Sequence, residues 1–147
     1  MKITAVETLR LDEFPNLIWV VLEDDAGNRG LGEGFFGAEA TESYIHESAA
    51  ALLVGQEITG PEELRRRLRP YVGHQAPGAE IHGNSAIDIA LWDLWGQRAQ
   101  APLWELMGGH SRERIRAYNT CAGYRYNPRG RGPADRQLGA GGQAGSL

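Results

Sequence analysis

The run SAIDIALWDLWG, residues 85–96, constrains the fold more than any other part of the chain. One apolar stripe recurs at helical spacing, formed by Ile87, Ala90, Leu91 and Leu94. Ile89 and Trp92 make the opposite side of the same helix apolar as well. A helix that is apolar on nearly every side is normally buried, so we expect this one to be the core of a helical layer.

Three segments ahead of this helix are predicted to be strands of a β-meander: residues 2–11, 17–23 and 29–36. The second, LIWVVLE, is rich in β-branched and aromatic residues. Gly27 and Asn28 favour a tight turn before the third segment. The third segment, RGLGEGFF, contains three glycines, which indicate close packing or a bulge.

The remaining elements are predicted from helix boundary signals. We expect a helix over residues 39–54 with Gly55 as its C-cap, and a second helix opened by Pro61. Residues 74–83 are predicted to be a loop, after which Asn84 or Ser85 caps the apolar helix. A short helical turn over residues 103–109 and a strand over residues 114–119 complete the pattern.

Composition excludes several classes of function. The formal net charge of −4 gives no electrostatic case for binding nucleic acid or an anionic membrane. No apolar run approaches the roughly 20 residues of a membrane helix. We expect no signal peptide, because acidic residues follow Lys2 too early. Cys121 is the single cysteine, which excludes an internal disulfide, so we expect a cytoplasmic protein.

Asp88 and Asp93 are the first candidates for chemistry, because they lie within the apolar helix. Five positions place them about 140° apart around a helix, so they do not converge readily on one metal ion. The favoured interpretation is structural: each carboxylate pairs with an arginine or accepts from a backbone N–H. Trp92, Trp95 and Trp104 are likewise assigned to core packing rather than to a ligand pocket.

Two further motifs are rejected as sites. His46, His74, His82 and His110 lack the spacing of metal ligands. The glycines around Glu33 lack the GxGxxG spacing, and no Walker lysine follows them. Neither motif is therefore predicted to be a catalytic or metal-binding site.

The order of these features resembles a known family. The run SAIDIALWDLWGQRAQAPLWELMGG, the Gly-Glu-Gly strand end at residues 32–34 and the segment RIRAYNT are similar to the N-terminal part of the mandelate racemase/muconate-lactonizing branch of the enolase superfamily. The resemblance implies an α+β capping domain: a three-stranded antiparallel meander followed by a helical layer. In the family this domain precedes a TIM barrel, whose first strand the 114–119 segment resembles.

The resemblance also implies a chemistry. In the family, barrel carboxylates hold Mg²⁺, and a Lys or His base removes the proton next to the carboxylate of a small acid-sugar or related substrate. Racemases and acid-sugar dehydratases are typical members. By the same resemblance, loops of the cap shape the substrate site, which makes Phe14, Asn16, Phe35 and Phe36 candidates, together with Asn119 near the end of the first barrel strand.

The chain departs from the family pattern beyond that strand. A TIM barrel takes about 250 residues, far more than follow Arg116, and Lys2 is the only lysine. We therefore expect a cap at residues 1–112, one barrel strand at 113–126 and a disordered tail at 127–147, whose Gly- and Arg-rich composition favours a frameshifted or truncated copy of a longer gene. A genuine disordered C-terminus is the alternative.

Two functions follow from this organisation. The first is the capping part of a Mg²⁺-dependent enzyme, inactive alone because it lacks the barrel and binding no metal itself. The second is a standalone binding or dimerisation module that uses the barrel-facing surface of the cap. A homo-oligomer is compatible with both.

Overall fold

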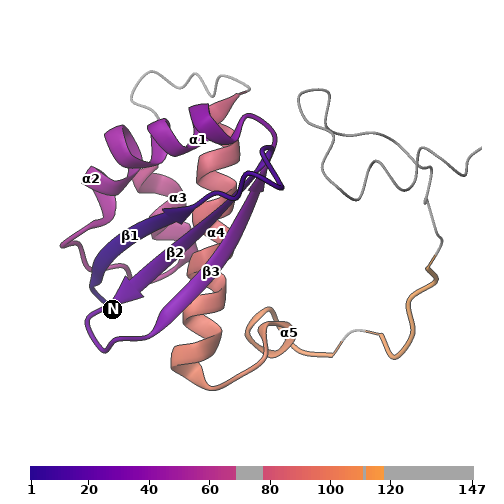
Figure 1. The fold of residues 1–147 in the computed structure, drawn as a ribbon. Helices are drawn as coiled ribbons and strands as arrows, with labels where there is room; N and C mark the ends of the chain where they lie inside the picture. Colours follow the sequence, from indigo (N-terminus) through magenta and orange to yellow (C-terminus); the bar gives the residue numbers. More distant parts are fainter. Residues whose placement is uncertain (69–77, 111, 118–147) are drawn as a thin grey trace, which may run out of the picture. The chain divides into compact units, whose positions relative to one another are not determined.

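The computed structural model describes residues 1–68, 78–110 and 112–117. By internal contacts the chain divides into two units, Met1–Glu113 and Arg114–Leu147. All the strands and helices of the described residues belong to the first unit. It is an α+β domain, as predicted, with a sheet on one side and helices on the other (Figure 1).

The sheet is the predicted antiparallel meander. Its strands are β1 (Ile3–Leu9), β2 (Leu17–Asp24) and β3 (Arg29–Phe35), in the order β1-β2-β3. The β2 side chains alternate between buried and half-buried positions, because successive residues of a strand point to opposite faces. The turn into β3 is closed by Asp24, whose Oδ1 accepts from the backbone N–H groups of Ala26 and Asn28, both at 2.9 Å.

The helical layer begins directly after β3. The predicted 39–54 helix is present as three consecutive pieces, α1 (Ala38–Tyr44), the π-helical turn η1 (Ile45–Ala49) and α2 (Ala50–Leu53). Gly55 follows with a positive φ of 81°, which confirms the predicted glycine stop. The helix opened by proline is α3 (Pro61–Arg67), and the long apolar helix is α4 (Ala79–Ala99), followed by the short α5 (Leu103–Leu106).

The predicted start of α4 is wrong. The helix begins at Ala79, so residues 79–83 are helical rather than a loop, while residues 74–77 lie outside the described part of the chain. Asn84 does not cap the helix because its side chain is used in packing. Its Oδ1 accepts from the Tyr44 hydroxyl at 2.8 Å, and its Nδ2 donates to the Leu68 carbonyl at 3.4 Å.

The backbone of α4 lies almost directly on β3. A Cβ atom added to Gly32 would stand 2.0 Å from the carbonyl oxygen of Ala86, and one added to Gly30 would stand 2.1 Å from that of Ala90. No side chain fits at either position without moving the helix. The glycines of the third strand therefore mark close packing, as predicted.

One hydrophobic core joins the two layers. The sheet contributes Ile3, Ile18, Val20 and Leu22, and α4 contributes Ile87, Leu91 and Leu94. The prediction that α4 is buried on nearly every side is wrong, because Ile81 is 39% exposed and Ile89 is 50% exposed. Ile81 lines a hollow that α4 forms with α3, and Ile89 is exposed to solvent.

The predicted barrel strand is also wrong where the structure describes it. Residues 114–117 form no strand, and Ile115 is 82% exposed. A β-strand exists only through hydrogen bonds to a neighbouring strand, and among the described residues none pairs with this segment. Residues 118–120, Cys121 and the 127–147 tail lie outside the described residues.

Candidate functional site

The predicted cap loops meet at one end of the sheet. The β1–β2 connection carries Phe14 and Asn16, and the end of β3 carries Phe35 and Phe36; both segments lie at the same end of the meander in Figure 1. Leu17 is the register partner of Phe35, and the N–H of Phe36 donates to the carbonyl of Asn16 at 2.8 Å. The structure therefore brings these four residues together, and it does not describe Asn119.

Aromatic rings dominate this end of the sheet. The edge of Phe14 meets Trp19, with ring centroids 6.4 Å apart and planes at 86°, which is a favourable T-shaped contact. The rings of Phe35 and Phe36 are also 6.4 Å apart. Phe14, Phe35 and Phe36 are 49%, 47% and 63% exposed. We call Phe14, Asn16, Trp19, Phe35 and Phe36 the tip cluster.

Phe36 has a strained backbone. Its φ of 75° lies in the left-handed region, which a bulky non-glycine residue rarely adopts. Such strain costs on the order of 1–3 kcal/mol and persists only where the surroundings hold it. Here the hydrogen bond to Asn16 holds the backbone, and Gly37 continues the left-handed turn into α1 with a φ of 67°. The turn leaves the Phe36 ring mostly exposed.

Trp19 is a member of the cluster that the sequence analysis missed. Its indole N–H donates to Oε2 of Glu33 on β3 at 3.1 Å, which fixes the ring against the outer face of the sheet. The two-residue period of a strand over residues 17–23 would have placed Trp19 on the same face as Leu17 and Val21, which is that outer face. The tip cluster thus offers aromatic surface and an amide, which suit shape selection and binding rather than proton transfer.

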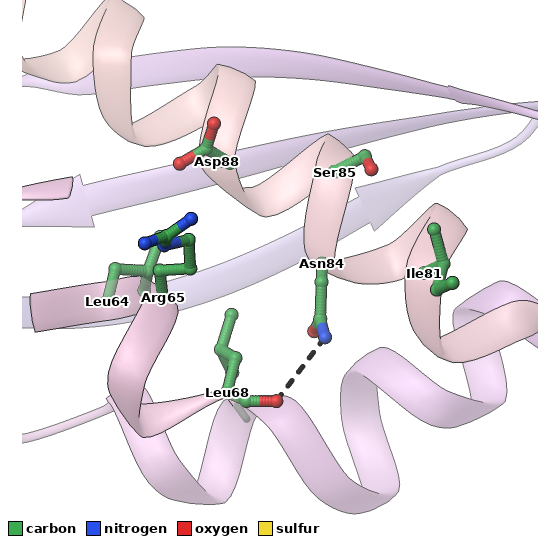
Figure 2. Close-up of a pocket in the computed structure, with 7 residues that line it drawn as sticks. All are labelled: Leu64, Arg65, Leu68, Ile81, Asn84, Ser85 and Asp88. Atoms are coloured by element: carbon green, nitrogen blue, oxygen red, sulfur yellow. Dashed lines mark hydrogen bonds between the residues drawn. The ribbon is translucent and has the colours of Figure 1, made fainter. Parts of the chain in front are cut away.

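The two helical aspartates do not form a pair. Oδ2 of Asp93 accepts from the N–H of Leu31 at 2.8 Å, which confirms its predicted role as a backbone acceptor. Asp88 instead lines a hollow of about 240 Å³ between α3 and α4, with Arg65 on the opposite wall (Figure 2). Burial raises the pKa of the Asp88 carboxyl and Arg65 opposes that rise, although no direct ion pair joins them.

The other candidates are mostly structural. Trp95 packs over Gly60, but Trp104 is 54% exposed, so its predicted place in the core is wrong. The single turn of α5 buries none of its residues, and the Trp104 ring meets the His110 ring edge-on. His46 Nε2 lies 2.7 Å from the Thr8 hydroxyl.

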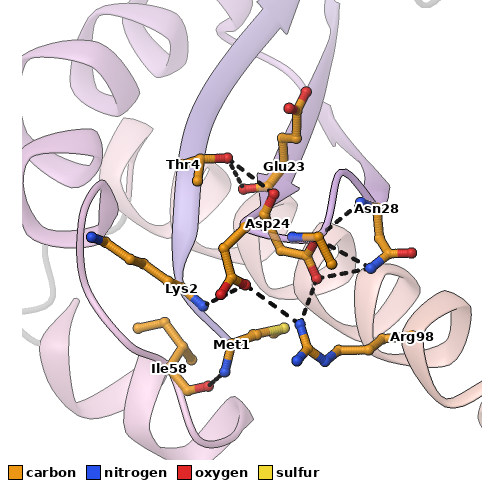
Figure 3. Close-up of polar contacts among 10 residues, drawn as sticks. Met1, Lys2, Thr4, Glu23, Asp24, Asn28, Ile58 and Arg98 are labelled. Atoms are coloured by element: carbon orange, nitrogen blue, oxygen red, sulfur yellow. Dashed lines mark hydrogen bonds and ion pairs between the residues drawn. The ribbon is translucent and has the colours of Figure 1, made fainter.

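A buried charge cluster at the opposite end of β2 was not predicted. Asp24 accepts from the backbone and side chain of Asn28 and from Arg98 of α4 (Figure 3). Asp24 is only 2% exposed, and all its hydrogen-bonding partners belong to the fold. The cluster therefore joins β2 to α4, and its role is structural.

A metal site was tested on the described residues. No three His, Cys, Asp or Glu side chains in residues 1–68, 78–110 and 112–117 gather in a way that could hold an ion. Asp93 is committed to a backbone N–H, and Asp88 lies on another face of α4. The described residues therefore do not fit a Mg²⁺ site.

Comparison with known proteins decides the family. The family model of the mandelate racemase/muconate lactonizing enzyme N-terminal domain matches residues 4–108. The chain belongs to this family. The match spans the meander, the helical layer and α5, and it confirms the resemblance seen in the sequence. The family is the Mg²⁺-dependent enolase superfamily.

Solved structures agree with this assignment. An enolase of the mandelate racemase subgroup from Agrobacterium tumefaciens is 47% identical, with a TM-score of 0.75; the match covers 80% of this chain and 33% of that one. An enolase protein from the Sargasso Sea environmental genome is also 47% identical, with a TM-score of 0.77 and coverage of 85% and 34%. This member of the family therefore spans about one third of the length of these relatives.

A third structure extends the range of relatives. A Zymomonas mobilis ZM4 protein, provisionally named a dehydratase, is 30% identical, with a TM-score of 0.67 and coverage of 76% and 30%. Like the other two, it shares its fold with this family member over the cap.

None of the helices in the described residues is both long enough and apolar enough to cross a bilayer.

Proposed function

We propose that this chain provides the capping domain of a mandelate racemase/muconate lactonizing-type enzyme, with residues 1–112 as the cap. The observation that carries the proposal is the tip cluster, in which strained backbone at Phe36 holds an aromatic ring out from the end of the sheet. Strain of this kind is concentrated at ligand clamps and switch regions. An exposed aromatic ring is well suited to close over a small substrate.

The reaction is proposed from the family and not from this chain's own residues. It is a Mg²⁺-dependent removal of the proton next to a substrate carboxylate, of the acid-sugar dehydratase or racemase type. The name of the Zymomonas relative supports the dehydratase branch. The substrate is a small acid sugar or related carboxylate, and the compartment is the cytoplasm. The chain alone is proposed to be inactive and to bind no metal.

Phe14, Asn16, Phe35 and Phe36 are the proposed substrate-shaping residues, and Asn119 remains a proposal outside the described residues. Phe14 and Phe36 supply ring surface from two different loops. The Asn16 carbonyl fixes one loop to the other through the Phe36 N–H. The cap is expected to discriminate among substrates by shape without supplying a catalytic group.

A chimera tests this role. Residues 1–112 of this chain replace the matched part of the Agrobacterium relative, and Mg²⁺-dependent turnover is measured across a panel of acid sugars. Phe14→Ala and Phe36→Ala should each change the ratio of kcat/KM between the best two substrates by about tenfold, or about 1.4 kcal/mol. Leu52→Ala is the matched control, since Leu52 is 47% exposed but lies on α2. Equal effects of all three substitutions would refute a role for the tip cluster.

The alternative is a standalone binding or dimerisation module. It is favoured by the exposed apolar residues on the outer side of α4, Ile81 and Ile89. The purified 147-residue chain distinguishes the two functions. Turnover by the chain alone that EDTA abolishes would contradict the proposed inactivity. A monodisperse dimer with a cooperative melt would favour the module.

A further inference from the structure

Glu33, at the centre of the Gly-Glu-Gly strand end, has a fixed position on the outer face of the sheet. Its neighbours Gly32 and Gly34 are buried on the opposite face, and a Cβ added to Gly32 would stand 2.0 Å from the Ala86 carbonyl oxygen. A slip of β3 by one residue would turn the Glu33 side chain toward that backbone, where it has no room. The two glycines therefore hold Glu33 outward and in register with β2.

Trp19 lies directly opposite Glu33. The two residues are register partners on β2 and β3, so their side chains stand next to each other on the same face. Oε2 of Glu33 accepts from the indole N–H of Trp19 at 3.1 Å. A carboxylate accepts only and an indole N–H donates only, so the two groups suit each other. This bond restricts rotation of the Trp19 side chain, because turning the ring away would break it.

The indole in turn supports the ring of Phe14. Two turns hold the Phe14 backbone: its N–H donates to the Leu11 carbonyl and its carbonyl accepts from the Leu17 N–H, both at 2.9 Å. These backbone bonds do not set the side-chain torsions. The Phe14 ring is 49% exposed and meets the Trp19 ring at 86°. Exposed side chains change rotamer freely unless packing holds them, so the contact with Trp19 sets the position of the Phe14 ring.

A purely structural role for Glu33 and Trp19 is the competing interpretation, since cross-strand pairs stabilise sheets. The bond between them lies on an exposed face. It also joins strands that already pair along residues 17–23 and 29–35, so the sheet does not depend on it. The feature that does depend on it is the orientation of the indole, and through the indole the position of the Phe14 ring.

We propose that Glu33 is a positioning residue for substrate selection: it holds Trp19, and Trp19 holds the Phe14 ring in the place where that ring shapes the substrate site. This inference rests on the proposed capping function. It gives Glu33 no contact with the substrate and no part in proton transfer. Any effect of Glu33 on substrate selection must therefore pass through Phe14, and removal of the Phe14 ring must abolish it.

Fluorine NMR of the full 147-residue chain observes the ring directly, without a substrate. The chain has three phenylalanines, all in the tip cluster, so labelling with para-fluorophenylalanine gives three resonances. Phe14→Leu identifies the Phe14 resonance, and Trp19→Leu gives its position without the indole. Glu33→Ala should move the resonance toward that position, whereas Glu33→Gln keeps an acceptor oxygen and should leave it in place.

Glu7→Ala is the matched control for the fluorine measurement. Glu7 is another exposed carboxylate on the outer face of the sheet, but it pairs with Arg29 and not with Trp19. Its removal changes the charge of the face by the same amount as Glu33→Ala. It should leave the Phe14 resonance unmoved.

The chimera of residues 1–112 with the Agrobacterium relative tests the consequence for substrates. Glu33→Ala should change the ratio of kcat/KM between the best two substrates by about threefold, less than the loss of the Phe14 ring, because the ring is still present. Glu33→Gln should restore the original ratio. In the Phe14→Ala background, Glu33→Ala should leave the ratio unchanged, which is the signature of a shared path in a double-mutant cycle.

Two results would overturn the positioning role. One is a Phe14 resonance that does not move in Glu33→Ala. The other is a Glu33→Ala effect on substrate ratios that persists in the Phe14→Ala background, because Glu33 would then act by another route. Failure of the proposed capping function looks different: the resonance moves as expected, but Phe14→Ala leaves the substrate ratio unchanged. That result would refute substrate selection by the ring and leave only the contacts from Glu33 to Phe14.

Discussion

Arg98, in the last turn of α4, donates from Nη1 to Oδ2 of Asp24, at the end of β2, over a distance of 2.8 Å. The two residues are 74 positions apart in the chain. Arg98 also lies 3.5 Å from Oδ1 of the exposed Asp25. This contact ties the C-terminal end of the long helix to the sheet at the end opposite the tip cluster.

The first prediction concerns acid stability. Burial alone would raise the pKa of Asp24, but hydrogen bonds from Asn28, Arg98 and Ala26 outweigh it and lower the pKa from 3.8 to about 2. A carboxyl with a depressed pKa in the folded state stabilises the protein above its unfolded pKa, and this contribution is lost as the pH falls from about 4 to about 2. We expect about 2 kcal/mol of unfolding free energy to disappear over that range.

Urea unfolding of the wild-type chain and of Asp24→Asn at pH 7 and pH 2.5 measures this. At pH 7 the wild type should be more stable than Asp24→Asn, and most of this difference in unfolding free energy should be gone at pH 2.5. Some pH dependence must remain in the variant, because Thr59 and Arg67 also lower the pKa of Glu63 to about 2. A stability difference that is the same at both pH values would show that Asp24 acts through packing alone.

The second prediction concerns the contact between β3 and α4. Gly32→Ala places a Cβ against the fixed backbone carbonyl of Ala86, so the helix must move off the sheet, which should cost about 3 kcal/mol or more. In Gly34→Ala the tightest contact of the new Cβ is with the movable Ile18 side chain at 3.0 Å, and the substitution should cost about 1 kcal/mol. Chemical denaturation of both variants gives the comparison, and equal costs would contradict it.

The third prediction concerns the end of α4. Gln100 has a φ of 51°, a left-handed conformation that favours glycine at this position after a helix. Gln100→Gly should therefore raise the unfolding free energy by about 0.5–1 kcal/mol, even though glycine increases the entropy of the unfolded chain. Ala99→Gly, one residue earlier and still helical, should lower it. Thermal melts of the two variants should shift in opposite directions.

The fourth prediction concerns the free edge of the sheet. Asp93 accepts from the N–H of Leu31 on β3, which is an edge strand, and so occupies a donor that could otherwise pair with another chain. Asp93→Ala should speed amide hydrogen exchange at Leu31 by about tenfold, or roughly 1.4 kcal/mol of local stability. Asp93→Asn retains an acceptor oxygen and should show a smaller effect. Unchanged exchange in Asp93→Ala would mean that another acceptor replaces the carboxylate.

Local patterns in the sequence predicted the elements well. The β-branched and aromatic residues at 17–23 and the glycine turn predicted the meander, and Gly55 and Pro61 predicted helix boundaries that the structure has. The start of α4 was misplaced because Asn84 has the chemistry of a cap but uses its amide to join Tyr44 and Leu68. A propensity rule cannot distinguish these two uses of one side chain.

Contacts between distant residues were not predictable in the same way. No spacing rule connects Asp24 with Arg98, because the contact depends on how α4 crosses the sheet. The tip residues were named from the resemblance to the family, and it is the structure that shows that the two loops meet, through the register between Leu17 and Phe35 and the hydrogen bond from Phe36 to Asn16. The strand predicted over residues 114–119 is absent from residues 114–117, the part that the structure describes. A strand forms only when a neighbouring strand pairs with it, and the sequence of the segment itself cannot supply that partner.

The seating of α4 on the glycines of β3 also has a mechanical consequence. Backbone meets backbone there, without the flexible side chains that would let one layer slide over the other. β3 and α4 therefore form one stiff unit that moves as a single body.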